Sequence, residues 1–171
     1  MKQKPTAQAF TLVELLVVIS IIAILAGLLL PAVIGAFTKA TEAQARSEVK
    51  SIEMAVKAYL NEYNRFPEIN TSDIVYGEGS KDNGFLIGVL RGTNVQLNAR
   101  RIVFLEVQDK SILNGNLVDP WDNQYRIAVD TSYDNVVQTG ASGIGNLAGR
   151  NVAVWSYGVN GSGTNSLIKS W

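Results

Sequence analysis

The chain has 171 residues, with 15 basic and 15 acidic side chains that give a formal net charge of zero. It contains no His and no Cys, which excludes a Ser-His-Asp triad, metal sites built on His, and disulfide bonds. A balanced charge also provides no basic field for nucleic acid, so no nucleic-acid partner is expected.

The first nine residues form a short polar segment. Lys2 and Lys4 make it positive, and a positive flank before an apolar run usually stays in the cytoplasm. The sequence therefore predicts a cytoplasmic N-terminus for a chain that enters a membrane directly afterwards.

A long apolar run follows. Residues 15–36 carry no charged side chain, and the run is long enough to cross the ~30 Å hydrocarbon core of a bilayer as a helix. Glu14 lies at the start of the run, where a carboxylate in lipid would cost roughly 2.5–3.5 kcal/mol. We predict a membrane helix over residues 10–37, and the charge at its start needs an explanation.

Residues with little side-chain bulk recur within this run at every fourth position: Ala23, Gly27, Pro31 and Gly35. In membranes, a helix face without bulky side chains lets two helices approach closely. We therefore assign Ala23, Gly27 and Pro31 to helix packing, although Gly and Ala are also common in membrane spans by composition alone.

The helical pattern continues beyond the apolar run. Apolar residues alternate at spacings of four and three, which places them on one face of an amphipathic helix: Ala45, Val49, Ile52, Val56, Tyr59 and Tyr63. We predict one nearly continuous helix over residues 12–63, ending before Pro67.

The remainder of the chain predicts a small sheet. Residues 83–90 favour a short helix, and three segments rich in β-branched and aromatic residues predict strands, at residues 102–107, 124–129 and 151–157. Short turns between strands imply antiparallel pairing. The fold class is α+β, with a long N-terminal helix whose amphipathic second half packs on a small C-terminal antiparallel sheet.

The apolar run has three interpretations. It could be a plain membrane anchor for an exported binding or enzymatic domain that does not assemble. It could be a secretory signal cleaved near Ala36. Neither of these explains Glu14, and the third interpretation does.

Residues 9–14 (AFTLVE), placed between a basic leader and a long apolar helix, resemble the processing signal of type IV prepilins and type II secretion pseudopilins. Ala9 stands where that family usually has Gly. Residues 64–67 (NRFP), 118–125 (VDPWDNQY) and 156–161 (SYGVNG) are similar, in the same order, to segments typical of major pseudopilins.

The resemblance implies that a prepilin peptidase cleaves between Ala9 and Phe10 and methylates the new Phe10 amine. It assigns residues 1–9 to a cleaved leader, residues 10–37 to a transmembrane and assembly helix, and residues 38–171 to an exported pilin-like domain that includes the second half of the helix. Thr11, Leu12 and Glu14 would serve recognition and assembly.

In an assembled filament the natural partner of Glu14 is the Phe10 ammonium of a neighbouring subunit, because a lone buried carboxylate is costly. The expected function is that of a structural, non-enzymatic subunit of a pseudopilus-type filament in type II protein secretion. A type IV pilus subunit, for adhesion, motility or DNA uptake, is the alternative within the same class.

The implied location is the inner membrane, with a single span, a cytoplasmic N-terminus and a periplasmic domain, and later an extracytoplasmic filament. The implied partners are the prepilin peptidase, identical subunits, minor pseudopilins, the inner-membrane assembly platform and membrane lipid. Major pseudopilins commonly bind calcium, but no Asp or Glu occurs here after Asp134. Weak calcium binding is expected at most, with Asp119, Asp122 and Asn160 as candidate ligands.

Overall fold

The computed structural model describes residues 11–68, 70–79 and 81–171. The chain divides into two compact units between Ala40 and Thr41. Ala9 and Phe10, the two residues of the predicted cleavage site, lie outside the described residues.

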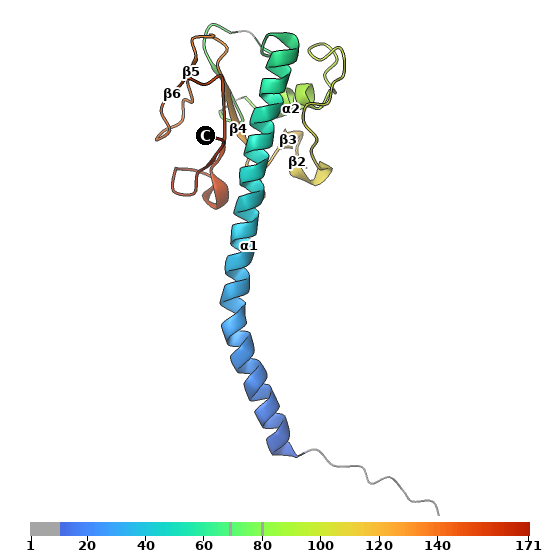
Figure 1. The fold of residues 1–171 in the computed structure, drawn as a ribbon, viewed down its shortest axis with the longest axis vertical. Coiled ribbons are helices and arrows are strands. Elements are labelled where there is room, and N and C mark those ends of the chain that lie inside the picture. The colour runs from blue at the N-terminus through green and yellow to red at the C-terminus, as the bar shows by residue number, and fades with distance from the viewer. Residues whose placement is uncertain (1–10, 69, 80) are drawn as a thin grey trace, which may run out of the picture. The chain divides into compact units, whose positions relative to one another are not determined.

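Helix α1 runs over Leu12–Tyr63 and continues through Pro31 (Figure 1). Side chains in its first part are exposed and mostly apolar, and Leu28, for example, is 73 % exposed. Among the described residues, α1 is the one helix that is long and apolar enough to cross a membrane. The predicted continuous helix is confirmed.

The second part of α1 packs against the C-terminal domain. Five of the six residues that the spacing predicted are buried there, namely Ala45, Val49, Ile52, Val56 and Tyr59, each at most 1 % exposed. Tyr63 is only partly buried, and Ala55 and Glu53 are buried as well. Full burial of a Val or Ile side chain contributes roughly 1.5–3 kcal/mol. This stripe therefore fixes the amphipathic part of α1 to the sheet.

The main sheet has four antiparallel strands in the order β1 (Ile74–Tyr76), β4 (Arg126–Val129), β7 (Val152–Ser156) and β8 (Ile168–Lys169). In its centre, Ile127 pairs with Val154 and Val129 with Val152. The predicted α+β class with a small antiparallel sheet is confirmed, and β4 and β7 lie within the strands predicted at residues 124–129 and 151–157.

Smaller elements complete the domain. Helix α2 (Gly84–Leu90) confirms the predicted short helix. Two hairpins pair β2 (Ile112–Leu113) with β3 (Asn116–Leu117), and β5 (Val136–Val137) with β6 (Leu147–Ala148). Two short 3₁₀ helices lie at Asp109–Ser111 and Gly158–Asn160.

The strand predicted at residues 102–107 is wrong. This segment forms no strand, because its backbone bonds to the end of α2 and to a side chain instead. The Phe104 and Leu105 N–H groups donate to the Leu90 carbonyl at 2.8 and 3.2 Å, and the Asn98 side chain bonds both backbone groups of Ile102. The β-branched residues of the segment predicted strand geometry, but its pairing partner is the end of a helix.

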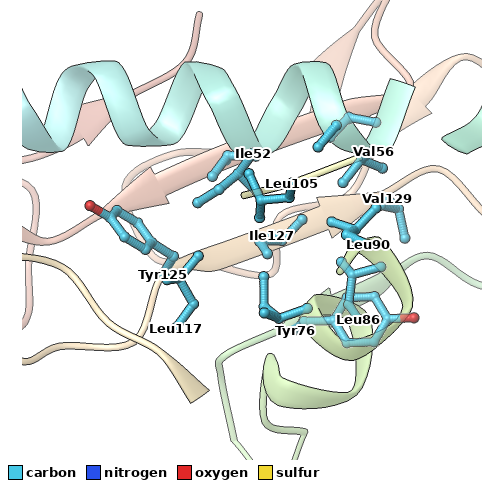
Figure 2. Packing of buried hydrophobic residues seen from close by; sticks show 14 of the residues in the cluster. Ile52, Val56, Tyr76, Leu86, Leu90, Leu105, Leu117, Tyr125, Ile127 and Val129 are labelled. Atoms are coloured by element: carbon cyan, nitrogen blue, oxygen red, sulfur yellow. The ribbon is translucent and has the colours of Figure 1, made fainter. Parts of the chain in front are cut away.

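Both faces of the sheet are covered. Toward α1, Ile127 and Val129 lie in the larger core together with Ile52 (Figure 2). On the opposite face, a second cluster surrounds the fully buried Trp155 and includes Ala128, Val137, Ala141, Ala153 and Tyr157. Side chains that alternate along β4 and β7 therefore enter two cores, and the β5–β6 hairpin covers the second.

Candidate functional site

The first described turn of α1 forms a capping box. The Thr11 N–H and hydroxyl donate to the Glu14 Oε2 atom at 2.9 and 2.7 Å, and the Glu14 N–H donates back to the Thr11 hydroxyl at 3.2 Å. Thr at the N-cap and Glu three positions later is the arrangement that satisfies orphan N–H groups at a helix start. Glu14 therefore has a partner within its own chain.

This pairing was missed by the sequence interpretation, which sought a partner for Glu14 only in another subunit. The signal was present, since Thr-x-x-Glu before an apolar run is the sequence pattern of a capping box. Leu12 and Val13, which lie between the two residues, are 79 % and 68 % exposed. Both apolar side chains therefore stay exposed beside the capping box.

The packing residues predicted in the apolar run are all exposed in the single chain. A Cβ atom added to Gly27 or to Gly35 would meet nothing within 4 Å. Ala23 and Pro31 are exposed as well. Nothing in the described part of this chain requires small residues here, so their role in helix packing stays a prediction about contacts with other molecules.

A second site lies in the domain, where two segments of the resemblance meet. Asp119 is 3 % exposed, and its Oδ1 atom accepts hydrogen bonds from the Trp121 and Asn123 N–H groups, both at 2.9 Å. The Ser156 hydroxyl donates to Asp119 Oδ2. The turn after Val118 is thereby fastened to the end of β7.

Gly158 completes this junction. Its N–H donates to the Ser156 hydroxyl at 2.8 Å, and its carbonyl accepts from Asn123 Nδ2 at 3.1 Å. It has a φ of +64°, and a Cβ at this position would lie 2.6 Å from the Ser166 carbonyl oxygen. Only Gly fits such a position without strain. The two separate sequence segments are thus one structural unit.

Two of the candidate calcium ligands at this junction already make contacts within the chain, and calcium binding that is weak at most stays a prediction. Both oxygens of Asp119 already accept hydrogen bonds from the chain, and Asn160 Nδ2 donates to the Ser166 hydroxyl at 3.1 Å. Asp122 is exposed in the turn. Across the described residues, no three acidic side chains converge in a way that could hold a metal ion.

Polar contacts join α1 to the rest of the domain. The Tyr125 hydroxyl donates to Glu48 Oε2, across 77 positions of the chain. Burial, followed by the hydrogen bond and the charge of Glu48, raises the pKa of Tyr125 above its ordinary value. Further along the helix, the Tyr59 hydroxyl donates to the Leu97 carbonyl at 2.8 Å. Side-chain hydroxyls therefore fix the helix to segments that follow it in the chain.

Asn83 makes a further set of buried contacts that the sequence interpretation missed. Its side chain donates to the Leu117 and Tyr125 carbonyls at 2.7 and 2.9 Å and accepts from the Leu117 N–H at 2.8 Å. It is fully buried and lies just before α2. A single Asn carries no sequence signal for such a role, since its partners are 34 and 42 positions away.

Comparisons with known proteins identify one matching family model and two curated relatives. Residues 4–30 match the family model described as the prokaryotic N-terminal methylation motif. The chain is 40 % identical over 65 residues to the type II secretion system core protein G of Aeromonas hydrophila, which is 38 % of this chain and 46 % of that protein. It is 40 % identical over 60 residues to the protein of the same name from Pectobacterium carotovorum subsp. carotovorum, 35 % of this chain and 38 % of that protein.

These matches leave much of each protein uncovered. The chain spans less than half the length of the two curated relatives it matches. No solved structure matches it significantly.

Proposed function

The chain belongs to the family of type IV pilins and type II secretion pseudopilins, and on this premise we propose that it is a structural subunit of a pseudopilus-type filament. The observation that carries the proposal is the exposed apolar part of α1, headed by the Thr11–Glu14 capping box and matched by the methylation motif. A helix that is apolar on all sides needs lipid or other helices around it.

Processing is the first step of the proposal. A prepilin peptidase hydrolyses the Ala9–Phe10 peptide bond on the cytoplasmic side, and the amine released on Phe10 is methylated. The positive leader keeps the bond on that side. The span over residues 10–37 then holds the subunit in the inner membrane, with residues 38–171 on the periplasmic side.

Assembly is the second step. In the membrane, Thr11 supplies hydrogen bonds to Glu14 and so lowers the cost of a carboxylate at the edge of the lipid. In the filament, the Phe10 ammonium of a neighbouring subunit becomes the stronger, charged partner. Only one axial position of the neighbour provides this pairing, so Glu14 sets the register, while the face with Ala23, Gly27 and Pro31 provides close helix packing.

Partners follow from the same steps. Besides the peptidase, they are identical subunits, minor pseudopilins, the inner-membrane assembly platform and membrane lipid. The family consists of structural subunits, and we propose no enzymatic activity for this member.

A type IV pilus subunit is the second candidate function. The two relatives are named as secretion system proteins, and the Asp119 junction joins two segments similar to those of major pseudopilins, which favours secretion. A membrane-anchored domain that does not assemble is the third candidate, and it predicts no processing at Ala9.

N-terminal sequencing combined with mass measurement of the membrane-extracted protein tests the proposal. We expect a mature chain that begins with methylated Phe10 when the peptidase is co-expressed, and an uncut chain without it. Ala9→Gly is the matched variant, expected to be processed at least as fast. A mature chain that starts near Phe37, or one that stays uncut with the peptidase present, would contradict the proposal.

A further inference from the structure

A basic hollow lies on the domain where the C-terminal segment passes α1. It has a volume of about 410 Å³ and is lined by Arg46, Ser47, Lys50, Lys169, Ser170 and Trp171. Three of these six residues are cations, and no acidic side chain lines the hollow. Two distant segments of the chain, on α1 and on β8, therefore bring positive charge to one place.

The three cations of the hollow form no ion pairs within the part of the chain that the structure describes. Other basic residues nearby do, since Lys57 and Arg150 lie 2.5 and 3.8 Å from the Oε1 atom of Glu53. Because Glu53 pairs with these two cations, it does not pair with the cations of the hollow. Glu48 is engaged elsewhere as well, because it accepts the hydroxyl bond of Tyr125.

Glu42 is the remaining acidic residue on this part of α1. It lies one turn before Arg46 and is exposed, and no ion pair joins the two side chains. No acidic side chain of the described residues therefore pairs with the three cations of the hollow.

The C-terminal side of the hollow is held in place by the sheet. Lys169 pairs with Trp155 in the β7–β8 register, and the Ser170 N–H donates to the Val154 carbonyl at 3.0 Å. The Trp171 ring packs edge-on against buried Trp155, with 6.4 Å between ring centroids. Lys169 Nζ lies 5.4 Å from the centre of the Trp171 ring. The cations thus line a site whose walls are fixed by the fold.

We infer that this hollow binds the phosphate of an anionic phospholipid headgroup. A guanidinium and two ammonium groups are a donor set that suits a phosphodiester. Trp is enriched where protein meets the membrane interface, because its ring is apolar and its N–H polar. Trp171 is half-buried beside the cations and matches that preference.

The membrane is favoured over a free anion as the source of phosphate. Arg46 and Lys50 follow the uncharged run of α1 by only ten and fourteen residues after Ala36. A domain tethered to a bilayer meets headgroups at a high effective concentration, which no soluble phosphate matches. The inference rests on the membrane anchoring in the proposed function.

The test uses the full chain in two kinds of lipid nanodisc. One contains phosphatidylcholine alone, and the other contains roughly 30 mol % phosphatidylglycerol in addition. Headgroup-nitroxide lipid quenches the fluorescence of Trp171, with Trp171→Phe as the blank for the other two Trp residues. We expect stronger quenching in the anionic discs and its loss at high salt, since surface charges are screened. Each basic side chain near an anionic surface contributes about fivefold, so the variant Arg46→Gln/Lys50→Gln/Lys169→Gln should weaken docking about 100-fold.

A matched variant removes three positive charges elsewhere, as Arg65→Gln/Arg101→Gln/Lys110→Gln, and should dock like the native chain. Equal loss in both variants would overturn the inference, since it would reduce the effect to net charge. Equal quenching of the native chain in both kinds of disc would also overturn the inference. So would binding of inorganic phosphate or of a DNA duplex by a chain whose quenching does not depend on the lipid composition. Co-elution of the chain with neutral discs reports anchoring separately, so it distinguishes failure of the inference from failure of the proposed function.

Discussion

The buried hydroxyl of Ser156 donates a hydrogen bond to the carboxylate of Asp119, although the two residues are 37 positions apart in the chain. The bond joins the turn before β4 to the end of β7. Since Asp119 also accepts two backbone N–H groups of its own turn, one carboxylate organises both segments.

Replacing Asp119 by Asn should destabilise the domain. An amide nitrogen cannot accept a hydrogen bond, so at least one buried donor loses its partner, at a cost of about 2 kcal/mol. Thermal unfolding of the detergent-solubilised chain, followed by near-UV circular dichroism, should show a lower Tm. Asp122→Asn is the control, because it removes the same charge at an exposed residue with a φ of +64° that Asn also tolerates. Equal effects of the two substitutions would contradict the role of Asp119.

Calcium should change the stability of the chain little. The Asp119 oxygens are occupied by internal hydrogen bonds, and fewer carboxylates around a site mean weaker binding. A titration of Tm against calcium, with magnesium as the control for ionic strength, checks this. A large rise in Tm at micromolar calcium would show that the junction rearranges into a real site.

The bond between Tyr125 and Glu48 predicts a loss of stability at alkaline pH. Because the pKa of Tyr125 is raised in the folded chain, its contribution is complete below the ordinary value of 10.0 and is lost as pH rises above it. Tyr125→Phe should cost about 1 kcal/mol at neutral pH and should flatten the fall of Tm above pH 10. If the native chain and the variant lose stability in parallel there, another group is responsible.

Glu68 predicts the opposite behaviour in acid. Burial raises the pKa of Glu68, but hydrogen bonds from Lys81 and Tyr76 and the charge of Lys81 outweigh it, so the pKa lies below its ordinary value of 4.5. Its contribution is complete above that pH and is lost as pH falls below it. The Glu68 side chain is 31 % exposed, so the effect should stay under about 1 kcal/mol.

Tm measured between pH 7 and pH 3, roughly the range of acid titration, tests Glu68. The fall of Tm with decreasing pH should be less steep in Glu68→Gln and also in Lys81→Met. The second variant removes the cation but keeps the length of the side chain. An unchanged slope in both variants would assign the acid sensitivity to other carboxylates.

The sequence predicted the elements that have a strong local pattern. The spacing of apolar residues in α1 identified its buried face, and β-branched residues located β4 and β7. Residues 102–107 have the composition of a strand, and only the position of the Leu90 carbonyl, set by the fold, decides their pairing. Strand β8 has two residues and no pattern of its own.

The contacts of the candidate site also differ in whether the sequence alone could predict them. The Thr11–Glu14 box is local and can be predicted from the sequence, whereas the contacts of Glu48 and Asn83 join residues that only the folded chain brings together. Residues 118–125 and 156–161 each resemble a segment of major pseudopilins, but the sequence does not show that they meet. The structure shows the hydrogen bond between Ser156 and Asp119 that links them.

The capping box predicts that Thr11 and Glu14 act differently in assembly. Glu14→Leu removes the carboxylate, so the chain should insert in the membrane as a monomer but form few filaments, since the register signal is lost. Thr11→Val keeps the shape of the side chain but removes the hydroxyl bonds to Glu14, which costs about 1 kcal/mol at the helix start. It leaves Glu14 free to pair with Phe10 of a neighbour, so filaments should still form.

Filament length and number by electron microscopy, at matched amounts of membrane-inserted protein, separate these two roles. Thr11→Ser is the control and should behave like the native chain, because it keeps the hydroxyl that bonds Glu14. Normal filaments from Glu14→Leu would refute the pairing of Glu14 between subunits. A loss as complete in Thr11→Val would show that assembly requires the capping box itself, because that variant keeps the carboxylate available to a neighbouring Phe10.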